Sequence, residues 1–298
     1  ELALNDFPSP EELTELYVKY QSLSADAKKA LFEPYYFAIG THEPRYYQRI
    51  AINRTVETVA NGLKRGLLVM ATGTGKTYTA FQIIHRLRQA GLKRRVLYLA
   101  DRNVLIDQTM KQDFKPFSKV MTKVQHKDVN TAYEIYMSLY GQWVEYDHER
   151  QSDPNREVDL SGVRQPYESL SPDFFDLIII DEAHSSQSGS LSAKMNIALS
   201  GEYDPEVSTE DKINQLMEAR KMLKNANYYA FTATPKNKTL EDFGIPCEEG
   251  GEIKHRPYHI YTMKQAIQEG FILDVLKYYT PISSFYKLAK PTKDNPLF

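Results

Sequence analysis

The sequence predicts an α/β fold of three layers, in which a mostly parallel central sheet lies between helices. Three apolar runs support this prediction, at residues 67–71, 177–180 and 228–231. Each has the length of a buried strand and ends in a polar cluster, and helical spacing occurs along the chain between them. Because such sheets bind ligands at the carboxyl ends of their strands, we expect one functional site at that edge.

The first run leads into a glycine-rich turn, followed by a helical pattern. The turn reads Thr72-Gly73-Thr74-Gly75-Lys76-Thr77. Its glycines allow several N–H groups to surround an anion, and the following helix adds the positive end of its dipole. Lys76 is then expected to reach the β- and γ-phosphates of ATP, and the Thr77 hydroxyl to coordinate Mg²⁺. A chance glycine-rich turn is the alternative, which the flanking strand and helix disfavour.

Composition limits the remaining possibilities. At 298 residues, the chain can form one large or two modest domains with a substantial core. Its formal net charge of −2 means that any contact with nucleic acid must come from local basic patches. The single cysteine, Cys247, excludes an internal disulfide, and no apolar run approaches the roughly 20 residues of a membrane span. We therefore expect a reduced, cytoplasmic compartment and no membrane partner. The chain begins at Glu1 without a methionine or a leader, so it is interpreted as a piece of a longer protein.

Residues 1–42 are expected to form a short helical lead-in. Ser9 precedes a proline and two acidic residues, which is typical of a helix start, and apolar residues follow at helical spacing. The main domain is expected to span residues 43–270, and its first helical pattern begins near Gln48. A glutamine amide can donate to and accept from the edge of adenine, so Gln48 is the candidate base-reading residue. A solvated helix start is the alternative.

A second buried strand is predicted at residues 95–100, ahead of the polar cluster Asp101-Arg102-Asn103 and a helix. Arg102 is a candidate contact to a nucleic-acid phosphate, weighed about evenly against a simple loop charge. Short strands are predicted at residues 120–125 and 133–140, with a helix as the alternative for the second. Residues 142–172 are highly charged in part, so they are interpreted as an exposed insertion.

The apolar run at residues 177–180 ends in Asp181-Glu182-Ala183-His184, so two adjacent carboxylates follow a strand that is buried on both faces. Asp181 can hold the Mg²⁺ that bridges the β- and γ-phosphates, and Glu182 can orient and deprotonate the attacking water. His184 is expected at the far side of the nucleotide, where it could link γ-phosphate occupancy to neighbouring loops. An ordinary strand with an acidic end is the alternative, which the phosphate loop upstream disfavours.

Two threonines, Thr232 and Thr234, follow the third apolar run. Their hydroxyls can bond the two carboxylates or His184, which would couple hydrolysis to movement. Ahead of this run, residues 204–224 predict a charged helical segment whose basic face is most simply solvated.

Taken together, these motifs resemble the first RecA-like P-loop NTPase domain of superfamily 2 helicases and translocases. The resemblance rests on Gln48 and on residues 70–77, 181–184 and 232–235. Ala71 is the first small residue of the phosphate loop, as in motif I of that superfamily, whereas the general pattern has a glycine where Met70 stands. Four linking stretches are similar to the R (restriction) subunit of type I restriction-modification enzymes. They are residues 44–51, 100–103, 185–189 and 261–272.

The resemblance implies a translocase that uses ATP and Mg²⁺ to move double-stranded DNA, with methyltransferase and specificity subunits as partners. It implies a nuclease domain upstream and a second RecA-like domain downstream, toward which residues 271–298 would form an exit linker.

Two rival interpretations remain, namely another superfamily 2 motor for DNA repair or RNA, and a nucleotide-gated binding module without turnover of its own. A nuclease site is a further question, because Asp242 with Glu252-Ile253-Lys254 matches the D…E-x-K pattern. We do not assign cleavage to these residues, since such letters are common by chance and Gly250 and Gly251 are expected to weaken the strand that should carry them.

Overall fold

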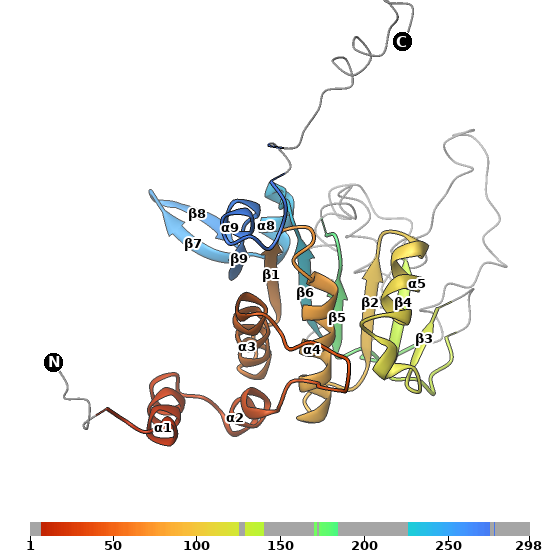
Figure 1. Cartoon of the computed structure of the whole chain (residues 1–298), viewed down its shortest axis with the longest axis horizontal. Helices are drawn as coiled ribbons and strands as arrows, with labels where there is room; N and C mark the ends of the chain where they lie inside the picture. The colour runs from red at the N-terminus through yellow and green to blue at the C-terminus, as the bar shows by residue number, and fades with distance from the viewer. Residues whose placement is uncertain are drawn as a thin grey trace, which may run out of the picture.

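The computed structural model describes residues 7–124, 129–139, 170–171, 173–183, 226–274 and 277. Its centre is a seven-stranded sheet with the order β3-β4-β2-β5-β6-β1-β9, in which every strand pair is parallel (Figure 1). The strands are β1 Arg65–Met70, β2 Val96–Ala100, β3 Met121–Lys123, β4 Ile135–Leu139, β5 Leu177–Ile180, β6 Asn227–Thr232 and β9 His259–Tyr261. The predicted α/β class and parallel sheet are therefore confirmed, and so is the strand interpretation of residues 133–140.

The described helices are α1 Pro10–Tyr20, α2 Ala25–Phe32, α3 Tyr46–Ala60, α4 Lys76–Gln89, α5 Asn103–Lys111, α8 Asn237–Phe243 and α9 Met263–Gln268, with a short 3₁₀ turn at Lys115–Phe117. None of these helices has both the length and the apolar composition to cross a membrane.

Strand residues alternate between the two faces of the sheet, and each face has its own core. On one face, strand residues such as Leu68 and Tyr98 pack with side chains from α3, α4 and α5. On the other face, the alternate residues Leu67 and Leu99 pack in a second cluster that includes Phe243 of α8. Helices on both faces give the predicted three layers.

The lead-in consists of two helices that differ in how they are held. Ser9 caps α1 in a reciprocal capping box with Glu12, as its sequence predicts, but α1 buries none of its residues. Helix α2 is attached to the domain by Arg86 of α4, whose guanidinium is fully buried. Arg86 donates to the Ala30 carbonyl at the end of α2 (3.0 Å) and to Asn53 Oδ1 of α3 (2.6 Å). A cation at the carboxyl end of a helix also interacts favourably with its dipole, so Arg86 makes α2 part of the domain.

One expectation about the region after β6 is wrong. Gly250 and Gly251 do not weaken a strand but form the two-residue turn of a hairpin, with φ of 67° and 82°, between β7 Ile245–Glu249 and β8 Glu252–Arg256. Positive φ at both central residues is what such tight turns require. Lys254 on this hairpin pairs with Glu249 (3.1 Å), whereas Asp242 is buried on α8.

The domain end expected at residue 270 stays a prediction, and the residues directly after it still contact the domain. The described residues 271–274 form neither helix nor strand. Phe271 instead lies against Tyr47 of α3, with ring centroids 5.1 Å apart. Packing on the domain therefore continues past residue 270.

Candidate nucleotide-binding site

The phosphate loop, residues 71–75, joins β1 to α4 in a tight turn. The Thr74 hydroxyl donates to the Ala71 carbonyl (2.6 Å), and both Gly73 and Gly75 have a φ of 82°. A Cβ on Gly75 would lie 2.4 Å from Nε2 of Gln48. Glycine is thus required at position 75 both by the backbone conformation and by this close approach. The first N–H groups of α4 have no partners within their helix, which favours an anion at this end.

Two side chains of α3 hold the loop from its other side. The Thr74 carbonyl accepts hydrogen bonds from Gln48 Nε2 (2.9 Å) and from the Tyr47 hydroxyl (3.1 Å). Gln48 Oε1 accepts from the backbone N–H of Arg45 (2.9 Å). Gln48 therefore contacts the phosphate loop directly, which sequence analysis did not foresee. The role of Tyr47 was also missed. A buried tyrosine usually finds a partner for its hydroxyl, but the burial of Tyr47 is known only from the structure.

The two carboxylates after β5 lie next to the phosphate loop. Lys76 Nζ is 3.1 Å from Oε1 of Glu182, and the Lys76 side chain is only 7% exposed. Asp181 accepts from the Tyr98 hydroxyl at Oδ2 (2.8 Å) and from the Glu182 N–H at Oδ1 (3.0 Å). Burial raises the pKa of Asp181, and the bond from Tyr98 partly opposes this effect. The site thus brings the predicted lysine and both predicted acids together.

Glu182 adopts an uncommon backbone conformation. Its φ is 48°, in the left-handed region that residues with a Cβ rarely occupy. Such conformations cost of order 1–3 kcal/mol and persist where the surroundings enforce them, which is typical of functional sites. The following residue, Ala183, donates its N–H to the Phe231 carbonyl of β6 (3.0 Å) and so fixes the end of β5.

The donor set fits a nucleotide with Mg²⁺. Thr77 stands half-buried in the first turn of α4, and Asp181 offers carboxylate oxygens after β5, which β6 separates from β1. Mg²⁺ usually takes one or two protein oxygens and completes its shell with phosphates and water. Within the described part of the chain, no cluster of three or more His, Cys, Asp or Glu residues could hold a metal by itself, so the phosphates would have to contribute.

The remaining predicted residues are placed only in part. Thr232 is fully buried and its hydroxyl accepts from the Thr234 N–H (3.2 Å), while Thr234 is exposed. Arg102 is exposed just ahead of α5, with Nε 3.4 Å from Oδ2 of Asp101. His184 lies outside the described residues, and so does the insertion at residues 142–172 except for residues 170 and 171. The coupling and DNA-binding roles therefore stay predictions.

A parallel sheet with a phosphate loop after β1 and paired carboxylates after β5 defines a RecA-like P-loop NTPase domain. The chain belongs to the family described as "Type III restriction enzyme, res subunit", whose model matches residues 41–237.

Its relatives include subunits of type I enzymes. The chain is 37% identical over 276 residues to the EcoAI type I restriction enzyme endonuclease subunit of Escherichia coli, covering 91% of this chain and 28% of that protein. It is 27% identical over 232 residues to the EcoKI endonuclease subunit of Escherichia coli K12, covering 77% and 17%. A fragment structure assigned to the HsdR subunit of a type I restriction enzyme from Vibrio vulnificus YJ016 matches with a TM-score of 0.56 at 30% identity, covering 90% and 38%. The expected resemblance to type I R subunits is confirmed, and the chain spans less than a third of these two curated relatives.

Proposed function

We propose that this chain is the ATP-binding half of a DNA translocase motor in the R subunit of a type I restriction enzyme. It would act in the cytoplasm on double-stranded DNA, together with methyltransferase and specificity subunits, and cleavage would belong to a nuclease domain outside residues 1–298. The observation that carries the proposal is the approach of Lys76 to Glu182, at 3.1 Å, beside the buried Asp181.

The residues of the site have distinct parts in hydrolysis. Lys76 would leave Glu182 to bind the β- and γ-phosphates, which releases the Glu182 carboxylate to orient and deprotonate the attacking water. Thr77 and Asp181 would hold Mg²⁺, which neutralises charge on the phosphates when bound. Tyr98 orients the Asp181 carboxylate by its 2.8 Å hydrogen bond. Gln48 would read the adenine base while it holds the Thr74 carbonyl.

Two further roles connect this site to DNA. Thr232 is the last residue of β6 and Thr234 follows it, and β6 lies between the strands that carry the phosphate loop and the carboxylates. The two threonines could therefore pass a change in Glu182 or His184 to neighbouring loops. Arg102 would bind a DNA phosphate, because its side chain is 78% exposed just after the carboxyl end of β2.

The test is steady-state ATP hydrolysis by the full-length protein without nucleic acid, with duplex DNA and with single-stranded RNA. An assay for displacement of a third DNA strand measures translocation. We expect hydrolysis and displacement that depend on duplex DNA and are lost in Lys76→Ala. Stimulation by RNA alone would favour another superfamily 2 motor, and nucleotide-dependent DNA binding without hydrolysis would favour a gated binding module.

A further inference from the structure

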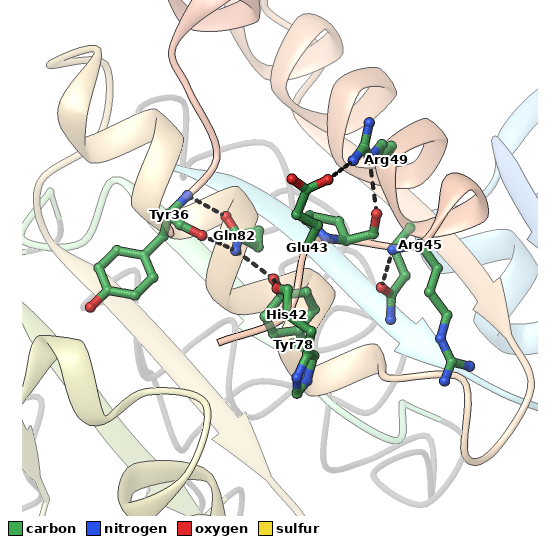
Figure 2. A network of polar contacts seen from close by, with 9 residues as sticks. Tyr36, His42, Glu43, Arg45, Arg49, Tyr78 and Gln82 are labelled. Carbon is green, nitrogen blue, oxygen red and sulfur yellow. Dashed lines mark hydrogen bonds and ion pairs between the residues drawn. The ribbon is translucent and has the colours of Figure 1, made fainter. Parts of the chain in front are cut away.

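The segment between α2 and α3, residues 33–45, crosses over α4 without helix or strand of its own; we name it the strap (Figure 2). Gln82 of α4 is fully buried and binds both backbone groups of Tyr36 in the strap. Its Oε1 accepts from the Tyr36 N–H (2.8 Å), and its Nε2 donates to the Tyr36 carbonyl (3.1 Å). One side chain thereby replaces the backbone partners that this irregular segment lacks.

A second attachment lies one helical turn before Gln82 on α4. Nε2 of Gln82 also donates to the Tyr78 hydroxyl (2.9 Å), which in turn donates to the His42 carbonyl (2.6 Å). All polar hydrogens of the Gln82 amide are thus used, and Figure 2 shows Gln82 beside Tyr36 and Tyr78 beside His42. Tyr78 stands only two residues after Lys76, so this attachment lies at the end of α4 that faces the phosphates.

The strap then leads into the residues that hold the phosphate loop. Arg49 Nε donates to the Pro44 carbonyl (2.9 Å), and Arg49 also pairs with Glu43. The next N–H, that of Arg45, donates to Gln48, whose amide donates to the Thr74 carbonyl. A continuous series of contacts therefore runs from Gln82 through Tyr78 and the strap to the phosphate loop.

The geometry points to Tyr78 as a positioning residue for the nucleotide site. Its hydroxyl fixes the His42 carbonyl, which fixes the end of the strap, and the strap holds the Gln48 amide in the orientation that contacts both Arg45 and the phosphate loop. This inference rests on the proposed ATP binding, and it assigns no contact between Tyr78 and the nucleotide. Loss of the hydroxyl should loosen Gln48 and the loop before ATP binds, so that KM rises while kcat changes little.

The chain offers a matched control within the same strap. The Tyr35 hydroxyl donates to Asn53 Oδ1 of α3 (2.8 Å), a hydrogen bond similar in kind to that of Tyr78. Asn53 leads to Arg86 and α2, not to the phosphate loop. If the strap only attached the lead-in helices to the domain, Tyr35→Phe and Tyr78→Phe would have equivalent effects.

The experiment compares Tyr78→Phe with Tyr35→Phe in the full-length protein, by DNA-stimulated hydrolysis of ATP and GTP and by thermal unfolding without nucleotide. For Tyr78→Phe we expect KM for ATP to rise about five-fold, the factor that corresponds to a hydrogen bond of about 1 kcal/mol, with kcat within about two-fold. Its preference for ATP over GTP should shrink. Tyr35→Phe should lower the unfolding temperature to a similar extent and leave KM unchanged.

A double-mutant cycle with Gln48→Ala tests the route. If Tyr78 acts through Gln48, adding Tyr78→Phe to Gln48→Ala should raise KM little further, whereas additive effects would overturn the inference. An unchanged KM in Tyr78→Phe would overturn it as well. Lys76→Ala separates a failure of this inference from a failure of the proposed function. Normal hydrolysis by Lys76→Ala would contradict the proposed ATP site, whereas loss of hydrolysis there with an unchanged KM in Tyr78→Phe would contradict only the role of Tyr78.

Discussion

Glu182→Gln tests whether the ion pair between Lys76 and Glu182 competes with ATP for the lysine. Under the proposed function, the pair of Lys76 and Glu182 would have to open before Lys76 binds phosphates, so the pair would compete with ATP. Exposed ion pairs contribute about 0.2–1 kcal/mol, and this one lies toward the upper end because its side chains are only 7% and 25% exposed. Glutamine keeps the shape of the side chain but removes its charge. We therefore expect the Kd for ATP to fall by roughly five-fold, which corresponds to about 1 kcal/mol.

Hydrolysis should become slower although ATP binding becomes tighter. Without the carboxylate that deprotonates water, the single-turnover rate should fall by about 10²–10⁴. The assay combines an equilibrium titration with a fluorescent ATP analogue and a single-turnover hydrolysis measurement. Asp107→Asn is the matched control, because it breaks another lysine–carboxylate pair, Lys123–Asp107 at 2.8 Å, away from the phosphate loop. A Kd that stays constant or rises would refute the competition, and normal hydrolysis would refute the role of Glu182 as base.

Four other substitutions give separate readouts. Lys76→Ala should abolish or severely weaken Mg-ATP binding in a calorimetric titration, since it removes the cation of the phosphate loop; an unchanged titration would remove the whole proposal. Gln48→Ala should reduce the preference for ATP over GTP or CTP in competition titrations, and no base preference in the unmodified protein would retire its reading role. Arg102→Ala should weaken duplex binding equally across DNA sequences with a shallower salt slope, whereas a sequence-specific loss would contradict a phosphate contact. Burial lowers the pKa of His259 to about 4, below the 6.5 of an unfolded histidine, and neither ring nitrogen has a partner within the described residues. The unfolded chain thus binds the proton more readily, so the stability contributed by neutral His259 is present above pH 6.5 and declines toward pH 4. In His259→Leu the unfolding temperature should fall less between pH 7 and 5, and parallel profiles would argue against this account.

The sequence predicted the strands and the loop well because each has a local signal. Residues 177–180 are four consecutive aliphatics, and a run of that kind has few alternatives to a buried strand when two acids follow it. The contacts that complete the site have no local signal. Tyr98 bonds Asp181 across 83 positions of the chain, and that pairing depends on β2 lying beside β5. Strand order is a property of the whole fold, which a pattern within one segment does not contain.

The hairpin turn was predicted wrongly and the strap was not predicted at all, for different reasons. A double glycine is compatible both with a weak strand and with a tight turn, and the choice depends on whether the flanking residues pair, as β7 and β8 do. The strap has no periodicity, and apart from a local turn between Ala38 and Thr41 its backbone is held by side chains of α4 and α3. Gln82 in particular reads as an ordinary helix residue until its burial is known.

The order of the sheet also determines when during synthesis the nucleotide site can form. Strand β1 carries the phosphate loop, but its two neighbours are β6 and β9. Asn227 of β6 donates to the Leu63 carbonyl just ahead of β1, and these two residues are 164 positions apart in the sequence. A nascent chain that has emerged from the ribosome only as far as β5 therefore has its phosphate loop on a strand without either partner. Long-range parallel pairing of this kind is slow and leaves apolar strands exposed in the meantime. The proposed ATP site should accordingly be among the last parts of the domain to form.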